Sequence, residues 1–293
     1  MKNLELNSVK DLKKEGKSFY WASFFLPRYI RTKAGKLYSI CRYFDDLADK
    51  DKEDKSLFWK ETIEKIKNDR ESTVNNYLQE NNINISIFID FIEGLIKDQK
   101  NVKIQNKKEL IIYSYNVAGT VGLMMSKIIG VVNIKANSAA IDLGIAMQLT
   151  NIIRDVYEDA QMNRIYLPAD LIPDITLSML NGEQILGSKQ EYIISNAIQQ
   201  LIDLSEKFYL NGFSGLKYIP YRTRLGIYIA ANVYRGISIK IRSKGKRYLK
   251  KRVYLSFIEK TIITIKSISI FIFIPIINYK YKNIRDKFQN ENL

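Results

Sequence analysis

The sequence predicts an all-α protein, and two observations support this fold class. Apolar residues recur at steps of three and four through most of the chain, which is the spacing of one face of an α-helix. The 293 residues include only five prolines and fourteen glycines, and these lie mostly between the long periodic stretches. The pattern differs from the short alternating runs that are typical of a β-sandwich or a barrel.

The predicted helices follow one another with short polar breaks, none of them long enough to be a linker between domains. They cover residues 34–50, 56–70, 84–98, 107–130, 134–160, 188–212, 222–243 and 253–274. With 46% hydrophobic residues, a chain of this length can bury one large core. We therefore expect one domain over residues 1–293, with 263–293 as an apolar and then basic C-terminal segment.

The reactive side chains restrict the chemistry of the protein. The sequence contains no histidine and a single cysteine, Cys41, which excludes His-based triads, Cys/His zinc sites and disulfides within the chain. Carboxylates, Tyr, Lys, Arg or a recruited hard cation must then carry any reaction. The N-terminus has no apolar signal region, so we expect a cytoplasmic protein, with peripheral contact at the inner face of a membrane as an open alternative.

The formal net charge of +15 favours contact with polyanions such as nucleic acid, an anionic membrane or diphosphates. The lysines are spread along the chain, as on an ordinary solvated surface. No zinc knuckle, aromatic RNA-binding pattern or helix-turn-helix occurs in the sequence, and we therefore expect no nucleic-acid partner.

The most apolar stretch of the chain is ITIKSISIFIFIPIIN, residues 263–278. Lys266 interrupts it and Pro275 ends it before it reaches the length of a membrane span, so we expect no transmembrane helix. Two interpretations remain: a final core helix, or a helix that rests on a membrane with the basic flank YKYKNIRDK beside it.

One acidic stripe lies in KLYSICRYFDDLADK. Steps of four, three and four place Tyr38, Arg42, Asp45 and Asp49 on one helical face. Like charges four residues apart repel each other, and a divalent cation relieves that repulsion.

A second acidic stripe lies in GIAMQLTNIIRDVYEDAQMNRIYLP. Gln148, Asn151, Asp155 and Asp159 are spaced three, four and four along a helix that is otherwise rich in apolar residues. A single pair of this kind is usually a solvated surface pair, but two stripes on two apolar helices favour a functional site.

Paired acidic stripes suit the cleavage of a diphosphate. Mg²⁺, for which Mn²⁺ can substitute, prefers oxygen ligands and is typically held by one or two carboxylates together with substrate phosphates. Metal ions and basic side chains neutralise the charge that builds on a diphosphate as its C–O bond breaks. An allylic carbocation would remain, and an apolar cavity between helices would protect it from water.

A third segment, YSYNVAGTVGLMM (113–125), carries small residues on one side of a helix. Because glycine inside a helix costs about 1 kcal/mol relative to alanine, Gly119 and Gly122 indicate close approach of a ligand or of another backbone. Tyr113, at the start of the segment, could offer its phenol to a cation or to a proton in transit.

At these residues the chain resembles the squalene/phytoene synthase family of head-to-head prenyl diphosphate synthases. The resemblance is carried by KSFYWASFFLP (17–27), LYSICRYFDDLAD (37–49), YSYNVAGTVGLMM (113–125), GIAMQLTNIIRDVYEDAQMNRIYLPADL (144–171), and more weakly by YIAANVYRGI (228–237) and KKRV (250–253). The sequence departs from the family pattern at Glu15, where several relatives carry His, and at Asn232, where Arg is common.

The resemblance implies the isoprenoid synthase fold, in which helices surround a central apolar cavity, and it implies a role for each matching residue. The implied Mg²⁺ ligands are Asp45, Asp49, Asn151, Asp155 and Asp159. The implied substrate-binding residues are Ser18, Tyr38, Arg42, Gln148, Asn151, Arg154, Arg164, Tyr234 and Arg252. The four aspartates and Tyr113 are the implied catalytic residues.

The resemblance also implies a reaction in which two prenyl diphosphates condense through a cyclopropylcarbinyl diphosphate. We favour two geranylgeranyl diphosphates that form phytoene in carotenoid biosynthesis, because residues 146–160 and 164–171 are most similar to the bacterial phytoene branch. The final cation of that branch loses a proton, so no NADPH is expected. One alternative is a squalene or dehydrosqualene synthase that acts on farnesyl diphosphate. The other is a non-catalytic assembly or lipid-binding relative, and the presence of the four aspartates argues against it.

Overall fold

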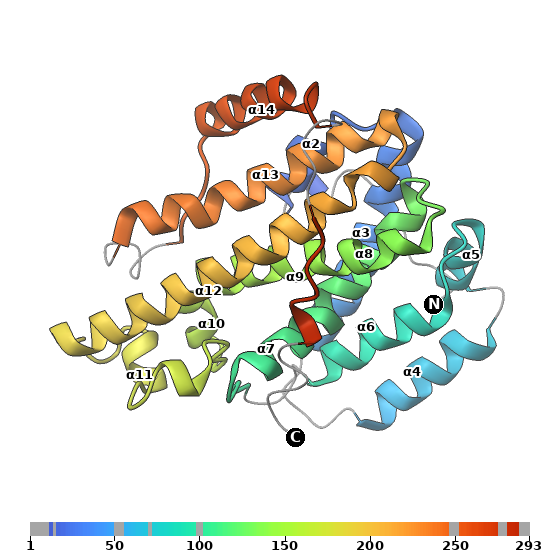
Figure 1. The fold of residues 1–293 in the computed structure, drawn as a ribbon. Coiled ribbons are helices and arrows are strands. Elements are labelled where there is room, and N and C mark those ends of the chain that lie inside the picture. Colours follow the sequence, from blue (N-terminus) through green and yellow to red (C-terminus); the bar gives the residue numbers. More distant parts are fainter. Residues whose placement is uncertain are drawn as a thin grey trace.

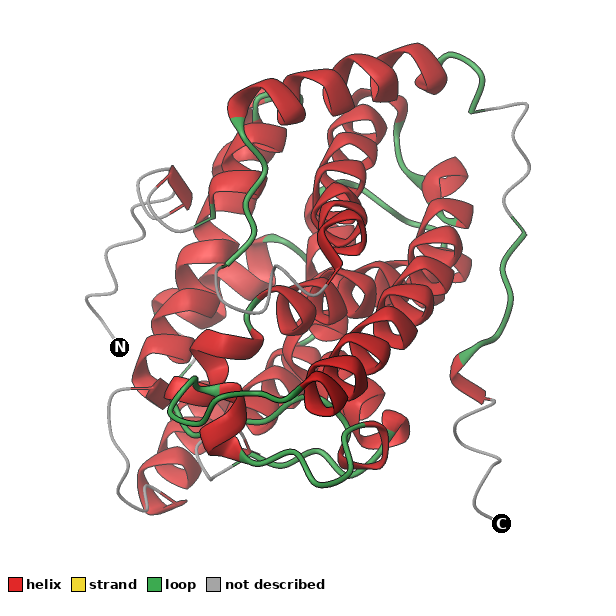
Figure 2. Cartoon of the chain, turned by 90° about the vertical axis from the view of Figure 1, so that its left-hand side faces the viewer, coloured by secondary structure: helices red, strands yellow, loops and turns green. Residues whose placement is uncertain are grey.

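The computed structural model describes residues 12–13, 16–49, 56–69, 72–97, 102–245, 252–274 and 280–286, and these residues form helices joined by loops (Figures 1 and 2). The helices are α2 (Lys17–Ser23), α3 (Arg28–Asp49), α4 (Ser56–Asn68), α5 (Thr73–Glu80), α6 (Ile85–Lys97), α7 (Lys107–Ser114), α8 (Thr120–Ile128), α9 (Asn137–Arg154), α10 (Val156–Gln161), α11 (Leu177–Leu180), α12 (Ser188–Ser214), α13 (Tyr221–Lys244) and α14 (Phe257–Phe271). The described residues contain no β-strand, and Lys103 and Ile165 form an isolated parallel bridge. The all-α prediction is confirmed.

Helix α9 lies at the centre of the fold (Figure 1). It contacts α7, α8, α12 and α13, together with a π-helical turn, Tyr115–Gly119, that joins α7 to α8. Buried hydroxyl groups add a polar link between three of these helices: Thr150 Oγ1 lies 2.9 Å from the Tyr209 hydroxyl and 3.0 Å from Ser238 Oγ. Because these groups satisfy one another, they can be buried without a large desolvation penalty.

Glycines let α9 approach α8 and the π turn closely. A Cβ atom on Gly122 would lie 2.2 Å from the carbonyl oxygen of Ala140, and one on Gly144 would lie 2.2 Å from the carbonyl oxygen of Ala118. Backbone therefore meets backbone at these two positions. Of the two interpretations of the small residues in 113–125, the structure supports helix packing for Gly122.

Several helices differ from the predicted ones. The predicted helix 134–160 is broken at Asp155, whose backbone leaves the helical region at φ −104° and ψ 15°, so α9 and α10 are separate helices. The predicted helix 107–130 contains the π turn. Helix α5 was not predicted because its sequence, TVNNYLQE, is mostly polar. Ser72 begins α5 by accepting a hydrogen bond from the backbone N–H of Asn75, as an N-cap does.

Helix α14 lies on the outside of the molecule, beyond α13 (Figure 1). Thr264, Ser267 and Phe271 on its inner side are buried, whereas Ile258 and Ile265 on its outer side are 68% and 59% exposed. The interpretation of 263–278 as a final core helix is therefore wrong for the described part of that segment. No helix in the described ranges is long and apolar enough to cross a bilayer.

Candidate active site

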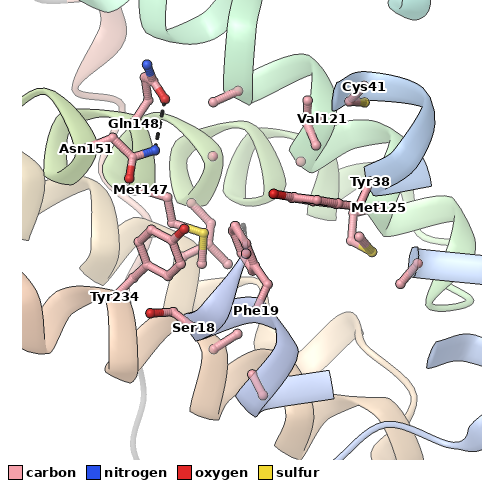
Figure 3. Close-up of a pocket in the computed structure, with 18 of the residues that line it drawn as sticks. Ser18, Phe19, Tyr38, Cys41, Val121, Met125, Met147, Gln148, Asn151 and Tyr234 are labelled. Carbon is pink, nitrogen blue, oxygen red and sulfur yellow. Dashed lines mark hydrogen bonds between the residues drawn. The ribbon is translucent and has the colours of Figure 1, made fainter. Parts of the chain in front are cut away.

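One large cavity, of about 990 Å³, lies between α2, α3, the π turn, α8, α9 and α13. Figure 3 shows side chains from several of these helices projecting into it, among them Tyr38 from α3, Met147 from α9 and Tyr234 from α13. Much of its wall is apolar, with Val121 and Met125 of α8 as examples. The predicted cavity between helices is confirmed.

The structure brings the predicted site residues together at this cavity, although they come from distant parts of the chain. Its lining includes Ser18, Tyr38, Arg42, Asp45, Tyr113, Gln148, Asn151, Arg154, Asp155, Asp159, Arg164, Tyr234 and Arg252. The side chain of Asp49 lies outside the described residues, as does Glu15. The structure therefore places these residues at the cavity, and their roles in substrate binding, metal binding and catalysis stay predictions.

On the α3 side, Arg42 binds two carboxylates of its own helix. Its Nη1 atom lies 2.9 Å from Asp45 Oδ2, and its Nη2 atom lies 2.7 Å from Asp46 Oδ1. The half-buried Cys41 lines the same wall. Burial, together with the charge of Asp45, raises the pKa of the Cys41 thiol to about 12, so this cysteine is protonated and inert at neutral pH.

On the opposite side, Asp155 binds two arginines from different segments. Arg154 donates from Nε and Nη2 to the two carboxylate oxygens, at 2.7 and 2.6 Å. Arg252 adds a hydrogen bond from Nη2 at 3.1 Å, and its Nε lies 2.8 Å from Oδ1. Burial works to lower the pKa of Arg154, but the hydrogen bonds and charge of Asp155 outweigh it and raise that pKa. These groups form a fixed charged cluster at the end of α9.

Asn151 presents an unused acceptor to the cavity. Its Nδ2 donates to Gln148 Oε1 at 3.2 Å (Figure 3), whereas its Oδ1 is buried and has no hydrogen-bond partner among the residues that the structure describes. Buried amide oxygens are normally paired, so an unpaired one beside a cavity is expected to have a ligand.

Aromatic rings flank the charged groups. Tyr113 stacks on Tyr166 with ring centroids 4.9 Å apart, and Phe19 lies 4.6 Å from Tyr234. Burial raises the pKa of Tyr234, so its phenol is neutral and can donate a hydrogen bond into the cavity. Faces of such rings can stabilise a cation in a dry site.

The described residues contain no group of three His, Cys, Asp or Glu side chains close enough to form a metal site. Asp155 and Asp45 are engaged by arginines instead. Since the side chain of Asp49 is not described, the predicted first acidic motif is represented here by Asp45 alone.

The lining also contains side chains that were not predicted as site residues. Tyr166 stacks on Tyr113, and Lys17 and Lys260 both line the cavity. Burial and the charge of Lys17 lower the pKa of Lys260. Tyr166 and Lys17 lie within the segments that carry the family resemblance, and only the fold brings Lys260 to Lys17.

Helices enclosing an apolar cavity with charged groups at its wall define the class of all-α isoprenoid synthases. The family model for squalene/phytoene synthases matches residues 12–259, and the chain belongs to this family, which is one of prenyltransferases.

Relatives of known name agree with this. A phytoene synthase from Pseudescherichia vulneris is 34% identical over 172 residues, which is 59% of this chain and 55% of that protein. This chain therefore spans about half the length of that relative. A phytoene synthase from Thermus thermophilus is 31% identical over 269 residues, 88% of this chain and 90% of that protein. The crystal structure of a dehydrosqualene synthase with a bound ligand superposes with a TM-score of 0.76 at 26% identity, over 90% of this chain and 95% of that one.

Proposed function

We propose that the protein condenses two geranylgeranyl diphosphates head to head to form phytoene. The observation that carries this proposal is one large cavity of about 990 Å³ with a largely apolar wall, which also holds acidic and basic side chains from α3, from the end of α9 and from the segment after α13. The polar groups suit diphosphates and the apolar wall suits prenyl chains. The similarity to phytoene synthases supports the choice of product.

The acidic residues fit a divalent cation. Asn151 Oδ1 is a buried oxygen with no hydrogen-bond partner among the described residues, and Asp155 and Asp159, four and eight residues further along the chain, line the same cavity. Oxygen donors of this kind suit Mg²⁺, with Mn²⁺ as a substitute. The ligands would be Asp45, Asp49, Asn151, Asp155 and Asp159. The bound metal would neutralise the charge that builds on the leaving diphosphate.

The arginines are proposed to bind diphosphate oxygens directly. Arg42, Arg154 and Arg252 now contact carboxylates, and a guanidinium group binds a phosphate as readily as a carboxylate. We expect them to exchange part of these contacts for the substrate diphosphates. The further residues proposed for substrate binding are Ser18, Tyr38, Gln148, Arg164 and Tyr234, all of which line the cavity.

The apolar wall would then protect the cation. Loss of one diphosphate and one proton joins the two chains as a cyclopropylcarbinyl diphosphate, and loss of the second diphosphate leads to a rearranged cation that is quenched by losing a second proton. Tyr113 and its stacked partner Tyr166 lie at the cavity, where Tyr113 could hold that proton or face the cation. This route consumes no NADPH.

The second candidate is a synthase that acts on farnesyl diphosphate, and the similarity to a dehydrosqualene synthase structure favours it. Incubation of the purified protein with farnesyl or geranylgeranyl diphosphate, each with and without NADPH, separates the two candidates when products are identified by mass. We expect phytoene from geranylgeranyl diphosphate without NADPH. Squalene or dehydrosqualene as the main product would overturn the choice of substrate.

We also propose that the protein binds a membrane surface, because phytoene is a hydrocarbon that is insoluble in water. The outer face of α14 exposes Phe257 at 72%, together with Ile258 and Ile265, and Ile272, which follows the helix, is 73% exposed. Lys266 is exposed on the same helix. Such a face suits an anionic lipid surface. Ile258→Ser with Ile265→Ser should reduce co-sedimentation with anionic vesicles. The control Ile134→Ser, at a residue 77% exposed outside α14, should not; equal binding of both variants would contradict the proposal.

A further inference from the structure

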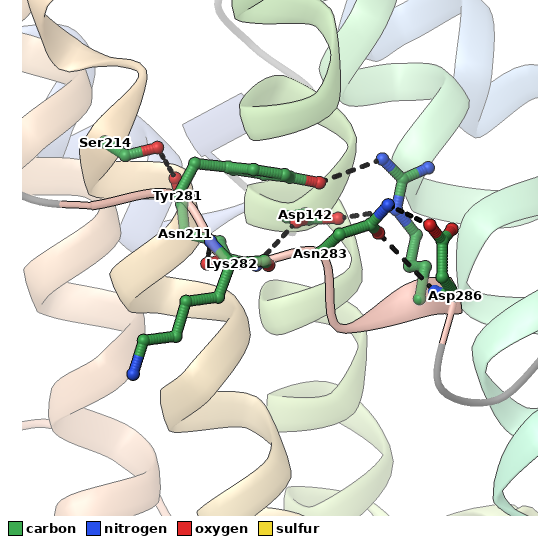
Figure 4. A network of polar contacts seen from close by, with 8 residues as sticks. Asp142, Asn211, Ser214, Tyr281, Lys282, Asn283 and Asp286 are labelled. Atoms are coloured by element: carbon green, nitrogen blue, oxygen red, sulfur yellow. Dashed lines mark hydrogen bonds and ion pairs between the residues drawn. The ribbon is translucent and has the colours of Figure 1, made fainter.

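The C-terminal segment 280–286 crosses the outer side of α9 and α12 and covers a buried carboxylate (Figure 4). That carboxylate belongs to Asp142 of α9, which is 0% exposed. The segment lies beyond residue 259, where the match to the family model ends. The family match therefore does not cover the contacts of this segment with the body of the protein.

Arg285 supplies the charge that balances Asp142. Its Nε lies 2.9 Å from Asp142 Oδ1, and Asn211 of α12 donates to Asp142 Oδ2 at 2.9 Å. The phenol of Tyr281 contacts both Arg285 and Asp142. Because a charge removed from water must be paired to be tolerated, Asp142 depends on these partners.

Asn211 also binds the backbone of residues 280–286 directly. Its Nδ2 donates to the backbone carbonyl of Lys282 at 2.6 Å, and its Oδ1 accepts from the backbone N–H of Lys282 at 3.0 Å. One side-chain amide thus satisfies both backbone groups of one residue. The side chain of Lys282 is exposed and points away from Asp142 (Figure 4).

The charge of Arg285 also reaches the π turn. The Tyr115 phenol lies near Asp90 of α6 and near Arg285; burial and Asp90 raise the pKa of this phenol, and Arg285 lowers it. The half-buried Arg285 side chain therefore contacts Asp142 of α9 and lies close enough to Tyr115 of the π turn to affect its phenol. A π turn is an irregular, strained piece of helix, which makes an external support useful.

These elements form the wall of the cavity. Leu143, Gly144 and Met147 of α9, next to Asp142, line it, as do Val117 and Ala118 of the π turn. Gly144 packs directly against the Ala118 carbonyl. Because α9 and the π turn are packed backbone against backbone here, a shift of α9 at Asp142 is expected to move the cavity wall as well.

We infer that residues 280–286 act as a strap that positions the cavity wall, with Arg285 holding α9 against the π turn by neutralising Asp142. Arg285 is a positioning residue, because it is not among the residues that line the cavity. The strap would act on the wall itself, whichever prenyl diphosphate the cavity accepts.

Hydrogen exchange of the full-length protein tests the strap. In Arg285→Met, we expect amides of residues 115–122 and 139–147 to exchange at least about tenfold faster, because a buried charge is left without its partner. Amides of α14 should be unaffected. Arg285→Lys, which keeps the charge, should retain much of the protection, and the control Lys282→Met, which leaves the backbone contacts in place, should match the wild type.

The double variant Asp142→Asn with Arg285→Met distinguishes charge neutralisation from simple packing. Removing the buried charge should restore protection that Arg285→Met loses, even if the single variant unfolds. Unchanged exchange in Arg285→Met, or a double variant no better protected than the single one, would overturn the inference. Turnover of prenyl diphosphate by the same variants is a separate measurement: its absence in the wild type would count against the proposed function and leave the exchange result intact.

Discussion

Asp155 is the residue on which the proposed chemistry depends most. It ends α9, begins α10 and accepts from Arg154 and Arg252, and its side chain is only 16% exposed. In the proposed reaction its carboxylate is needed for the metal, whereas its arginine partners can turn to the diphosphates. The same side chain would therefore exchange a structural contact for a chemical role during turnover.

Asp155→Asn keeps the size of this side chain and removes its charge. We expect kcat/KM to fall by about 10²–10³-fold, as for loss of one group that stabilises transition-state charge, while circular dichroism still shows a folded protein. The matched control is Asp203→Asn, since Asp203 pairs with Arg242 at 2.5 Å on the surface and outside the cavity. Near-normal turnover by Asp155→Asn would contradict the metal assignment.

Sequence spacing was sufficient to group some site residues and insufficient for others. Steps of four and three placed Tyr38, Arg42 and Asp45 on one face, and all three line the cavity. The pairing of Arg252 with Asp155 joins residues 97 apart, so no local pattern could reveal it. The lone acceptor of Asn151 likewise depends on what packs around it, which only the fold decides.

At the scale of helices, α14 begins with a capping box. Ser256 accepts from the backbone N–H of Glu259, and the Glu259 carboxylate accepts from the Ser256 N–H and from Lys240 of α13. The hydrogen bond from Lys240, together with those from Ser256, lowers the pKa of Glu259 to about 2. This carboxylate thus ties α14 to α13 only while it is ionised.

The pH dependence of stability follows from that pKa. Because the folded-state pKa is below the unfolded one, the stabilisation is present above about pH 4.5 and is lost as the pH falls toward about 2. Glu259→Gln should lower the free energy of unfolding by about 0.5–1 kcal/mol at neutral pH, since solvent screens this partly exposed pair. Urea titrations should show that difference shrinking in acid; a constant difference across this range would contradict the assignment.

The contact of α9 with its neighbours predicts a strong effect of adding one methyl group. Gly144→Ala places a Cβ atom 2.2 Å from the Ala118 carbonyl oxygen, so we expect a loss of about 1–3 kcal/mol from overpacking. In the control Gly187→Ala the new Cβ atom would meet only the flexible end of Gln190, and the loss should stay below about 1 kcal/mol. Equal losses in thermal or urea unfolding would contradict close packing at Gly144.

Periodicity predicted the helices better than their interruptions. The apolar spacing through 134–160 continues across Asp155, so the pattern contains no sign of the break there. The π turn at Tyr115–Gly119 shifts the hydrogen bonds by one residue without changing the composition. Helix α14 was placed correctly, but its apolar content suggested burial, and the structure instead turns Ile258 and Ile265 outward.

At the scale of the whole molecule, the cavity is formed by several helices together and by no single helix. To the lining of the cavity, α3 contributes Arg42 and Asp45, the end of α9 contributes Asn151, and the segment after α13 contributes Arg252. α8 and α13 pack against α9, and α3 packs against α8, so these segments meet at one cavity. That residues 1–293 form a single domain stays a prediction.

The central claim is that aspartates from α3 and from the end of α9 together hold a metal-bound diphosphate. Calorimetric titration of the protein with inorganic pyrophosphate tests this most directly, in the presence of Mg²⁺ and in EDTA. We predict binding that requires Mg²⁺, that Mn²⁺ restores after EDTA, and that Asp45→Asn and Asp155→Asn each weaken at least about tenfold. Equally tight binding in EDTA, or affinity unchanged in both variants, would contradict the account.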